Sequence, residues 1–584
     1  MTDRKILQRF VISGLILMVA MTGLGARLAF LHLGPNEKMR QQIERVRRAE
    51  QKLAADRGMI CDARGAGNIL ALNMGVKDVC VDPQSLATNV RRQAVTVQLA
   101  QNLCMDAAEV ARQVNRSERR FVYVKRFVPE EQAAPIAALR LPGVFFEDAT
   151  VRFYPQRSFM CHVLGFVNHA GMGSAGIEQE ADPYLRGSPG YLRMRVNALR
   201  EEIVRDQYVP ALEGAHVTLT LDQNIQYIAE KVLDDLMREQ SAKAVWCIVE
   251  RIRTGEILAM ACRPCYDLNE FGTANESVKL NRAIGYLYEP GSTFKIAVIS
   301  AALEEHTVTP DVVFDCENGA WEYRGRVLRD YHPYGRLTVA DGIKKSSNIM
   351  AAKISLTLGD KTLYRYLRAF GIGGRLGIDL PGEETGILHA VSGWSAISGT
   401  RIAIGQGVAV TSLQMLGVMC AIANDGRLMR PYVIREVRED NGRILYQTRP
   451  KPLGQPISAR TAATMRHLLL RVTEPGGTGT KACVDGYDVA GKTGSAQKPV
   501  PGGYSSTAHM ASFVGFLPVE DPEIGIIVVA DEPQPFHTGG VVAAPAFSQM
   551  AAQIMHYLNV PSSVNLLASS GQQGARRHET GSTD

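Results

Sequence analysis

The chain has 584 residues, of which 46% are apolar and 21% charged, with a formal net charge of +6 at pH 7. This length predicts two or more domains, and the apolar fraction is sufficient for packed cores, which excludes a globally disordered protein. Lysine and arginine are spread along the chain, so the charge does not indicate a nucleic-acid-binding protein.

The N-terminal segment contains an uncharged run that predicts a membrane anchor. Residues 10–26 carry no charge, and the apolar pattern continues beyond Arg27. We predict a short tail at 1–9 and a transmembrane helix at 10–30, with Arg27 reaching toward the interface. A cleaved signal peptide is the alternative, but no A-x-A cleavage site follows. Basic residues on both sides leave the orientation open.

The next segments differ in their patterns. Residues 35–55 are highly charged and predict a helix rising from the membrane, and residues 57–215 mix short strands and helices with many glycines and prolines. Alternation at 216–222 predicts a strand, and the period of 223–240 predicts a helix. Residues 244–262 then indicate two strands joined at Thr254-Gly255.

The C-terminal part repeats the strand pattern. Residues 510–518 and 523–532 predict a second apolar hairpin, and Pro545–Leu558 predicts a helix. Strands at both ends of this region with helices between them predict an α+β domain whose sheet is closed by the C-terminal segment. The tail at 561–584 is rich in Ser, Gly and Gln and is expected to be mobile.

A lysine interrupts an apolar helix near the middle of the chain. Lys295 precedes a run without a polar face, and Pro290-Gly291 forms a turn ahead of Ser292. Ser292 and Lys295 are three residues apart and therefore share a helical face. A buried ammonium group is costly, so Lys295 either extends to solvent or is held in place to act on Ser292.

The ten cysteines have irregular spacings, and a chain of this size does not need disulfides for stability. Cys262 and Cys265 form the one close pair, which is compatible with a redox motif, half a zinc site or two small buried residues. We favour the last, because no second pair or Cys/His cluster completes a metal site.

Three short motifs occur in a suggestive order. S-x-x-K occurs at Ser292/Lys295 and again at Ser495/Lys498, and S-x-N occurs at Ser346–Asn348 and again in the polar tail at Ser563–Asn565. The single K-T-G is Lys492-Thr493-Gly494. Each motif alone could be a cap or a turn, but the order S-x-x-K, S-x-N, K-T-G in folded context is difficult to obtain by chance.

This set resembles the motifs of penicillin-binding proteins and class A β-lactamases. Other segments are similar to class B penicillin-binding proteins, the monofunctional peptidoglycan D,D-transpeptidases. They are R-G-M-I-C-D at 57–62, R-F-Y-P at 152–155, H-V-L-G at 162–165, G-I-E at 176–178 and L-R-G at 185–187. The stretch 323–348 resembles the septal, cell-division branch more than the elongation branch.

The resemblance implies an architecture and a location. It implies an elongated N-terminal pedestal (a dimerisation-type domain) at 31–215 and a penicillin-binding/serine β-lactamase-like transpeptidase domain at 216–560. The short tail would be cytoplasmic, with one span in the inner membrane and the bulk of the protein extracytoplasmic. No glycosyltransferase domain precedes residue 216, which implies a SEDS-type glycosyltransferase and other division proteins as partners.

The resemblance also implies roles for individual residues in cross-linking stem peptides that end in D-Ala-D-Ala. Ser292 would be the nucleophile and Lys295, in its neutral form, its base. Ser346 would relay a proton, and Asn348 would hold the substrate and Lys295. Lys492 would supply a positive electrostatic field and connect to the proton path. Thr493, Gly494 and Ser495 would bind the substrate, with the Thr493 and Ser495 hydroxyls on its terminal carboxylate. No metal or cofactor is implied, and β-lactam antibiotics would acylate Ser292.

Alternatives within the same superfamily are an elongation-type transpeptidase, a β-lactamase, a D,D-carboxypeptidase and a β-lactam sensor. The long pedestal and the anchor argue against the β-lactamase and the carboxypeptidase. A sensor is expected to carry an H-E-x-x-H zinc-protease module, which does not occur. Glu383 and Glu384 follow the S-x-N motif, where a deacylating base would be placed, but they lie in a Pro-Gly turn and are predicted to be exposed.

Overall fold

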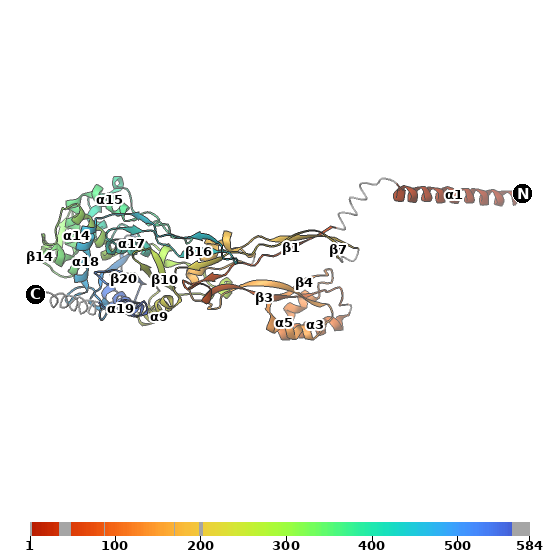
Figure 1. The fold of residues 1–584 in the computed structure, drawn as a ribbon, viewed down its shortest axis with the longest axis horizontal. Coiled ribbons are helices and arrows are strands. Elements are labelled where there is room, and N and C mark those ends of the chain that lie inside the picture. Colours follow the sequence, from red (N-terminus) through yellow and green to blue (C-terminus); the bar gives the residue numbers. More distant parts are fainter. Residues whose placement is uncertain (1–2, 34–47, 87, 169, 198–201, 563–584) are drawn as a thin grey trace, which may run out of the picture. The chain divides into compact units, whose positions relative to one another are not determined.

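A computed structural model describes residues 3–33, 48–86, 88–168, 170–197 and 202–562 (Figure 1). Tertiary contacts divide the chain into two compact units. One unit contains Met1–Ala55 and Gly187–Glu213, and the other contains Asp56–Arg186 and Gly214–Asp584. The second unit carries Ser292 and Lys295 of S-x-x-K, Ser346–Asn348 of S-x-N, and the K-T-G motif at 492–494.

The first unit combines one long helix with a small sheet. Helix α1 (Asp3–Leu33) contains a segment, Arg4–His32, that is long and apolar enough to cross a membrane. The antiparallel sheet has the order β1-β6-β7 and consists of β1 (Arg48–Leu53), β6 (Gly190–Val196) and β7 (Glu202–Val209).

Strand β1 shows that the helix predicted for 35–55 is wrong at its C-terminal end. β1 pairs with β6 from Arg48 opposite Arg195 to Leu53 opposite Gly190, and the Glu50 carboxylate lies 2.8 Å from Nε of Arg193. The partner strand is far away in sequence, so the local charge pattern could not indicate it. Residues 34–47 lie outside the described part of the chain.

The second unit begins with a seven-stranded sheet in the order β17-β16-β8-β2-β3-β4, with β5 also on β3. Helices α3, α4 and α5 pack over β3 and β4 in one buried cluster. The elements are β2 (Ile60–Cys61), β3 (Ile69–Val81), α3 (Asn89–Leu103), α4 (Ala107–Val114), β4 (Val122–Pro129), α5 (Glu130–Ala138), β5 (Val144–Phe153), α6 (Cys161–Leu164), α7 (Gly176–Glu180), α8 (Asp182–Leu185), β8 (His216–Leu219), β16 (Ile434–Arg438) and β17 (Ile444–Gln447).

A buried ion-pair network joins the sequence motifs of the pedestal segment. The Glu178 side chain is fully buried and accepts hydrogen bonds from Arg57 Nε at 2.7 Å and Arg152 Nε at 2.6 Å. The Tyr154 hydroxyl lies 3.2 Å from the same carboxylate. The motifs at 57–62, 152–155 and 176–178 therefore meet at one carboxylate.

We expect Glu178→Gln to destabilise the protein by about 3–5 kcal/mol, because it leaves the buried Arg152 guanidinium group without its counter-ion and Arg57 with Asp182 alone. Denaturant unfolding of purified protein measures the loss. The matched control is Glu180→Gln on the exposed side of the same helix, which should change stability by less than about 0.5 kcal/mol. Equal effects of the two substitutions would contradict a structural role for the network.

The remainder of the second unit is built on a five-stranded antiparallel sheet with the order β10-β9-β21-β20-β19. Strand β21 pairs with β9 along its full length, so the C-terminal hairpin completes the sheet that the first hairpin begins. This confirms the predicted α+β fold. The strands are β9 (Ala244–Arg251), β10 (Glu256–Arg263), β19 (Ala490–Val500), β20 (Gly503–Leu517) and β21 (Ile524–Asp531).

Helices cover both faces of this sheet (Figure 1). Alternate residues of β9 point to opposite faces: Val245 and Val249 pack with α9 and α19, whereas Trp246 and Ile248 belong to the cluster that contains α12, α14 and α17. The helices are α9 (Gln223–Glu239), α10 (Glu276–Lys279), α11 (Arg282–Gly285), α12 (Lys295–Glu304), α13 (Val339–Lys345), α14 (Asn348–Leu358), α15 (Asp360–Ala369), α16 (Ser398–Ile402), α17 (Ser412–Ala423), α18 (Ala459–Thr473) and α19 (Gly539–Tyr557).

Short strands complete the unit, namely β11 (Val313–Asp315), β12 (Ala320–Tyr323), β13 (Arg326–Arg329), β14 (Arg336–Thr338), β15 (Leu428–Met429) and β18 (Pro452–Gly454). The predicted start of the last helix at Pro545 is wrong, because α19 begins at Gly539 and contains Pro545. The Gly539 N–H donates to Ser495 Oγ at 3.0 Å. A tertiary contact thus accompanies the start of this helix, and local sequence did not reveal it.

Candidate active site

Ser292 and Lys295 meet at the entry to a buried helix. Ser292 lies in a 3-10 turn, Gly291–Phe294, that leads directly into α12. Gly291 has a φ of +57°, which favours glycine. The Lys295 side chain is fully buried, and its Nζ lies 2.9 Å from Ser292 Oγ. The first of the two sequence alternatives, extension of Lys295 to solvent, is therefore wrong.

The S-x-N motif faces the same lysine from the junction of two helices. Ser346 ends α13 in the left-handed conformation, and Ser347 caps the N-terminus of α14. Lys295 Nζ lies 2.6 Å from the Ser346 carbonyl oxygen, 3.2 Å from Ser346 Oγ and 2.7 Å from Asn348 Oδ1. The left-handed turn directs both side chains of the motif toward Lys295.

Asp330 supports this junction and was missed by the sequence analysis. Its carboxylate accepts hydrogen bonds from Ser347 Oγ at 2.7 Å, from the Asn348 N–H and from the Ile349 N–H at 3.1 Å. A carboxylate at a helix N-terminus is stabilised by the unpaired amides there. The only sequence signal was an acidic residue in the stretch that resembles the septal branch.

The K-T-G motif brings a second buried lysine to the site. Lys492 lies on β19, is fully buried, and places Nζ 2.8 Å from Ser346 Oγ. Ser346 Oγ therefore lies between the two lysines. Gly494 has no room for a side chain, because an added Cβ would lie 2.3 Å from Ser512 Oγ and 2.9 Å from Thr293 Cγ2.

Burial determines the electrostatics of the two lysines. Loss of solvation lowers the pKa of Lys295 to about 7, although the Asp330 carboxylate acts in the opposite direction. Loss of solvation, together with the nearby charge of Lys295, also holds the pKa of Lys492 well below its ordinary value. Lys295 can therefore be neutral near neutral pH, which a general base requires.

The motif residues border a cleft of about 670 Å³. Thr493 and Ser495 line it, with Thr493 Oγ1 2.9 Å from Thr478 Oγ1 and Ser495 Oγ accepting from the N-terminus of α19. The lining residues that the structure describes include lysines and histidines but no carboxylate. This cleft suits an anionic ligand.

The second S-x-x-K pair is not a comparable dyad. Ser495 and Lys498 lie on a β-strand, and Lys498 Nζ lies 2.6 Å from Glu532 Oε1. The carboxylates of Asp531 and Glu532 raise the pKa of Lys498 above its ordinary value despite its partial burial, so it cannot act as a neutral base. The second S-x-N motif, at 563–565, lies outside the described residues.

Two other sequence expectations concern Cys262/Cys265 and Glu383/Glu384. All ten cysteines are free thiols, with Cys262 buried and Cys265 partly exposed. The prediction that Glu383 is exposed is wrong: its carboxylate is buried and accepts from the N–H groups of Leu376 at 2.6 Å and Gly377 at 3.0 Å. The turn folds back over these amides, so Glu383 stabilises a loop.

Family models match two regions of the chain in the expected order. The model described as "Penicillin-binding Protein dimerisation domain" matches residues 52–219, and that described as "Penicillin binding protein transpeptidase domain" matches residues 245–555. The second match alone covers more than half of the chain and includes all three motifs.

Several individual proteins are similar to this chain along nearly its full length. The probable peptidoglycan D,D-transpeptidase PenA of Neisseria meningitidis serogroup A is 30% identical over 546 residues, covering 93% of this chain and 91% of that protein. Peptidoglycan D,D-transpeptidase FtsI of Escherichia coli K12 is 29% identical over 553 residues, covering 93% and 91%. Penicillin-binding protein 3 of Mycobacterium tuberculosis, crystallised with aztreonam, has a TM-score of 0.69 and 28% identity, covering 88% of this chain and 98% of that one.

Proposed function

The chain belongs to the class B penicillin-binding proteins and is a serine-type peptidoglycan D,D-transpeptidase, and we propose that it forms cross-links through an acyl ester on Ser292. The observation that carries the proposal is the 2.9 Å contact between Ser292 Oγ and a buried lysine with a depressed pKa. A serine hydroxyl needs such an adjacent base to be nucleophilic at neutral pH.

In the acylation step, Ser292 Oγ attacks the carbonyl carbon of the penultimate D-alanine while neutral Lys295 accepts the hydroxyl proton. The backbone N–H groups of Ser292 and Ser495 stabilise the oxyanion. When the C–N bond breaks, Ser346 passes a proton from the lysine pair to the leaving amine of the terminal D-alanine. Its position between both Nζ atoms supports this relay.

In the second step, an amine of a neighbouring stem peptide attacks the ester carbonyl, its proton returns to Ser292 through Lys295, and the new amide is the cross-link. Asn348 holds the donor amide and Lys295, Lys492 joins the proton path through its contact with Ser346 Oγ, and Gly494 allows close approach of the substrate. The hydroxyls of Thr493 and Ser495 bind the terminal carboxylate, in a cleft whose described lining contains no competing carboxylate.

Membership of this family also supports a location for the protein in the cell. We assign the chain to the division septum because it is similar to FtsI and because 323–348 resembles the septal branch. The α1 helix would anchor it in the inner membrane, with the tail at 1–9 cytoplasmic, the span at 10–30, and the pedestal at 31–215 and transpeptidase domain at 216–560 extracytoplasmic. A SEDS-type glycosyltransferase would polymerise the glycan strands, since the matched regions comprise dimerisation and transpeptidase domains.

We expect the penicilloyl ester on Ser292 to hydrolyse very slowly, because the described residues that line the cleft include no carboxylate that could direct water at it. Glu383 is engaged by backbone amides, and Asp330 is engaged by Ser347 and the start of α14. A chase of fluorescent penicillin from purified protein measures this lifetime, and cross-linking of lipid-linked substrate measures the activity.

Loss of the label within seconds would indicate a β-lactamase and would contradict the transpeptidase assignment. Release of D-alanine without cross-linked product would instead indicate a D,D-carboxypeptidase. A stable label with no turnover of lipid-linked substrate would favour a β-lactam sensor. Fluorescent fusions that follow the side wall rather than the division site would contradict the septal assignment and favour the elongation type.

A further inference from the structure

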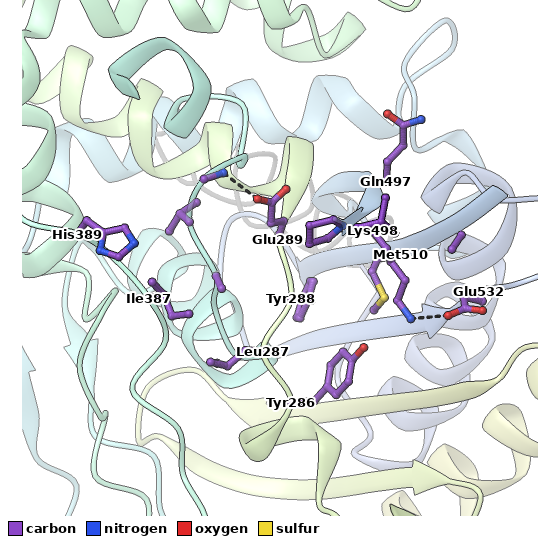
Figure 2. A pocket seen from close by; sticks show the side chains of 16 residues that line it. Tyr286, Leu287, Tyr288, Glu289, Ile387, His389, Gln497, Lys498, Met510 and Glu532 are labelled. Carbon is purple, nitrogen blue, oxygen red and sulfur yellow. Dashed lines mark hydrogen bonds and ion pairs between the residues drawn. The ribbon is translucent and has the colours of Figure 1, made fainter. Parts of the chain in front are cut away.

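The catalytic cleft follows strand β19 from Thr493 to Gln497, a distance of about 13 Å on an extended strand. At the Gln497 end the cleft borders a second pocket of about 620 Å³, which Gln497 also lines (Figure 2). The lysine that lines this second pocket, Lys498, is paired with Glu532, as Figure 2 shows, with 2.6 Å between Nζ and Oε1. The charge of Lys498 is therefore already balanced.

The Thr493 end of the cleft carries two lysines that lack such a partner. Thr493 Oγ1 lies 2.9 Å from Thr478 Oγ1, which belongs to the loop between α18 and β19. Lys345 Nζ donates to the Gly476 carbonyl oxygen of this loop at 2.8 Å, and Lys481 is an exposed residue of the same loop. Both lysines line the cleft, and neither forms an ion pair within the described residues.

The preceding lysine of α13 provides a contrast. Lys344 is adjacent to Lys345, but its Nζ lies 3.4 Å from Glu474 Oε2, and it does not belong to the described lining of the cleft. Glu474 therefore neutralises Lys344 and leaves Lys345 and Lys481 facing the cleft. Because the described lining contains no carboxylate, a carboxylate that pairs with these two lysines has to come from a ligand.

The two buried lysines of the site are unsuited to hold a substrate carboxylate. Loss of solvation lowers the pKa of Lys295 to about 7 and holds that of Lys492 well below its ordinary value. The pair therefore carries less than its full charge near neutral pH. The lysines in the described lining of the cleft are Lys345 and Lys481, so an anionic substrate meets their charges first.

The path of the acceptor peptide leads to this end of the cleft. The amine that resolves the acyl ester reverses the departure of the D-alanine amine, so by microscopic reversibility it approaches along the same path. Departure of D-alanine vacates the carboxylate position at Thr493 and Ser495, and the acceptor enters the space beside Thr478. A stem peptide has its own C-terminal carboxylate within a few residues of its amine, at about 3.3 Å per residue. That carboxylate then reaches the loop that contains Lys481.

We propose that Lys345 and Lys481 bind a carboxylate of the acceptor stem peptide while its amine attacks the ester on Ser292. The ligand class is thus an anionic peptide with a free amine. The site rests on the proposed function, and it adds two acceptor-binding residues outside the three motifs.

The test compares two acceptor tetrapeptides that carry the diamino acid of the host cell wall and end in a free carboxylate or in the carboxamide. Both lack the terminal D-alanine and cannot act as donors. With a fixed D-Ala-D-Ala donor, mass spectrometry of the product gives the acceptor KM. We expect a wild-type KM about 4- to 30-fold lower for the carboxylate, the range of two exposed ion pairs. In the double variant Lys345→Gln/Lys481→Gln the difference should fall to within about 2-fold.

Three controls separate charge from structure. Lys344→Gln removes the neighbouring charge that is paired with Glu474, and it should keep the difference. The double variant Lys345→Arg/Lys481→Arg retains both charges and should restore most of it. Release of D-alanine from the donor and fluorescent-penicillin labelling should stay within about 3-fold of the wild type in each variant, which shows that the Ser292 site is intact.

Equal acceptor KM values in the wild type, or an undiminished difference in Lys345→Gln/Lys481→Gln, would overturn the proposal. A matching loss in D-alanine release would place the two lysines on the donor carboxylate and would overturn it as well. Fluorescence anisotropy of the labelled acceptors on Ser292→Ala measures the same discrimination without turnover. If no cross-link forms but a lysine-dependent discrimination persists, the proposed function fails and the acceptor site stands. If cross-links form and neither measurement depends on the lysines, the acceptor site fails and the function stands.

Discussion

Replacing Ser292 with alanine is expected to abolish covalent penicillin labelling and cross-linking while leaving the unfolding temperature nearly unchanged. The substitution removes one hydroxyl from a 3-10 turn whose shape is set by Gly291 and by packing of Phe294. Without the oxygen no acyl ester can form, so the rate should fall by at least about 10⁴-fold. Gel fluorescence after penicillin labelling, together with a thermal melt, measures both effects.

The second S-x-x-K pair provides the internal comparison for this result. Ser495→Ala should still be labelled, at a reduced rate, because the hydroxyl is assigned to carboxylate binding and Lys498 is held by Glu532. Label that persists in Ser292→Ala, or that moves to Ser495, would show that the nucleophile has been assigned wrongly. A large fall in the melting temperature would instead show that Ser292 is structural.

Lys295→Arg is expected to be nearly as inactive as Lys295→Ala, with penicillin acylation slowed by about 10²- to 10⁴-fold in both. Arginine keeps the positive charge but cannot deprotonate in a protein. The experiment therefore distinguishes a base from a fixed cation. Lys498→Arg is the matched control, and it should acylate within a few-fold of the wild type because the charge beside Glu532 is retained.

The pH dependence of acylation tests the same assignment in the wild type. Because burial lowers the pKa of Lys295 to about 7, the neutral form dominates above that pH and is lost below it. The acylation rate should therefore rise between about pH 6 and 8 and then level off, with an apparent midpoint that belongs to the coupled lysine pair. A rate independent of pH from about 6 to 9, or substantial activity in Lys295→Arg, would contradict a neutral-lysine base.

Much of the fold could be predicted from local patterns because those patterns report local physics. The strand at β8, the helix α9 with its Asp222 cap, and the two apolar hairpins follow from alternation, helical period and turn residues. The beginning of α14 at the S-x-N motif likewise depends on the Ser347 cap. In each case the residues that determine the structure lie within a few positions of it.

The predictions that were wrong share a different cause. Strand β1 exists because it pairs with β6, Glu383 is buried because its own turn closes over backbone amides, and α19 begins at Gly539, where Ser495 accepts its first N–H. Neither the distant pairings nor the way the turn closes could be read from the neighbouring residues. The charge pattern therefore indicated the wrong structure for 48–53, and the Pro-Gly context indicated the wrong exposure for Glu383.

The sequence by itself determined which chemical groups this protein brings to its reaction: a serine three residues before a lysine, a serine and an amide, and a second lysine in a K-T-G motif. Only the tertiary structure decided what those groups can do. It places Lys295 among Ser292, Ser346 and Asn348 and brings Lys492 to Ser346 from strand β19. Loss of solvation lowers the pKa of both lysines. Solvation depends on everything packed around a group, so the reactivity of Lys295 is a property of the fold.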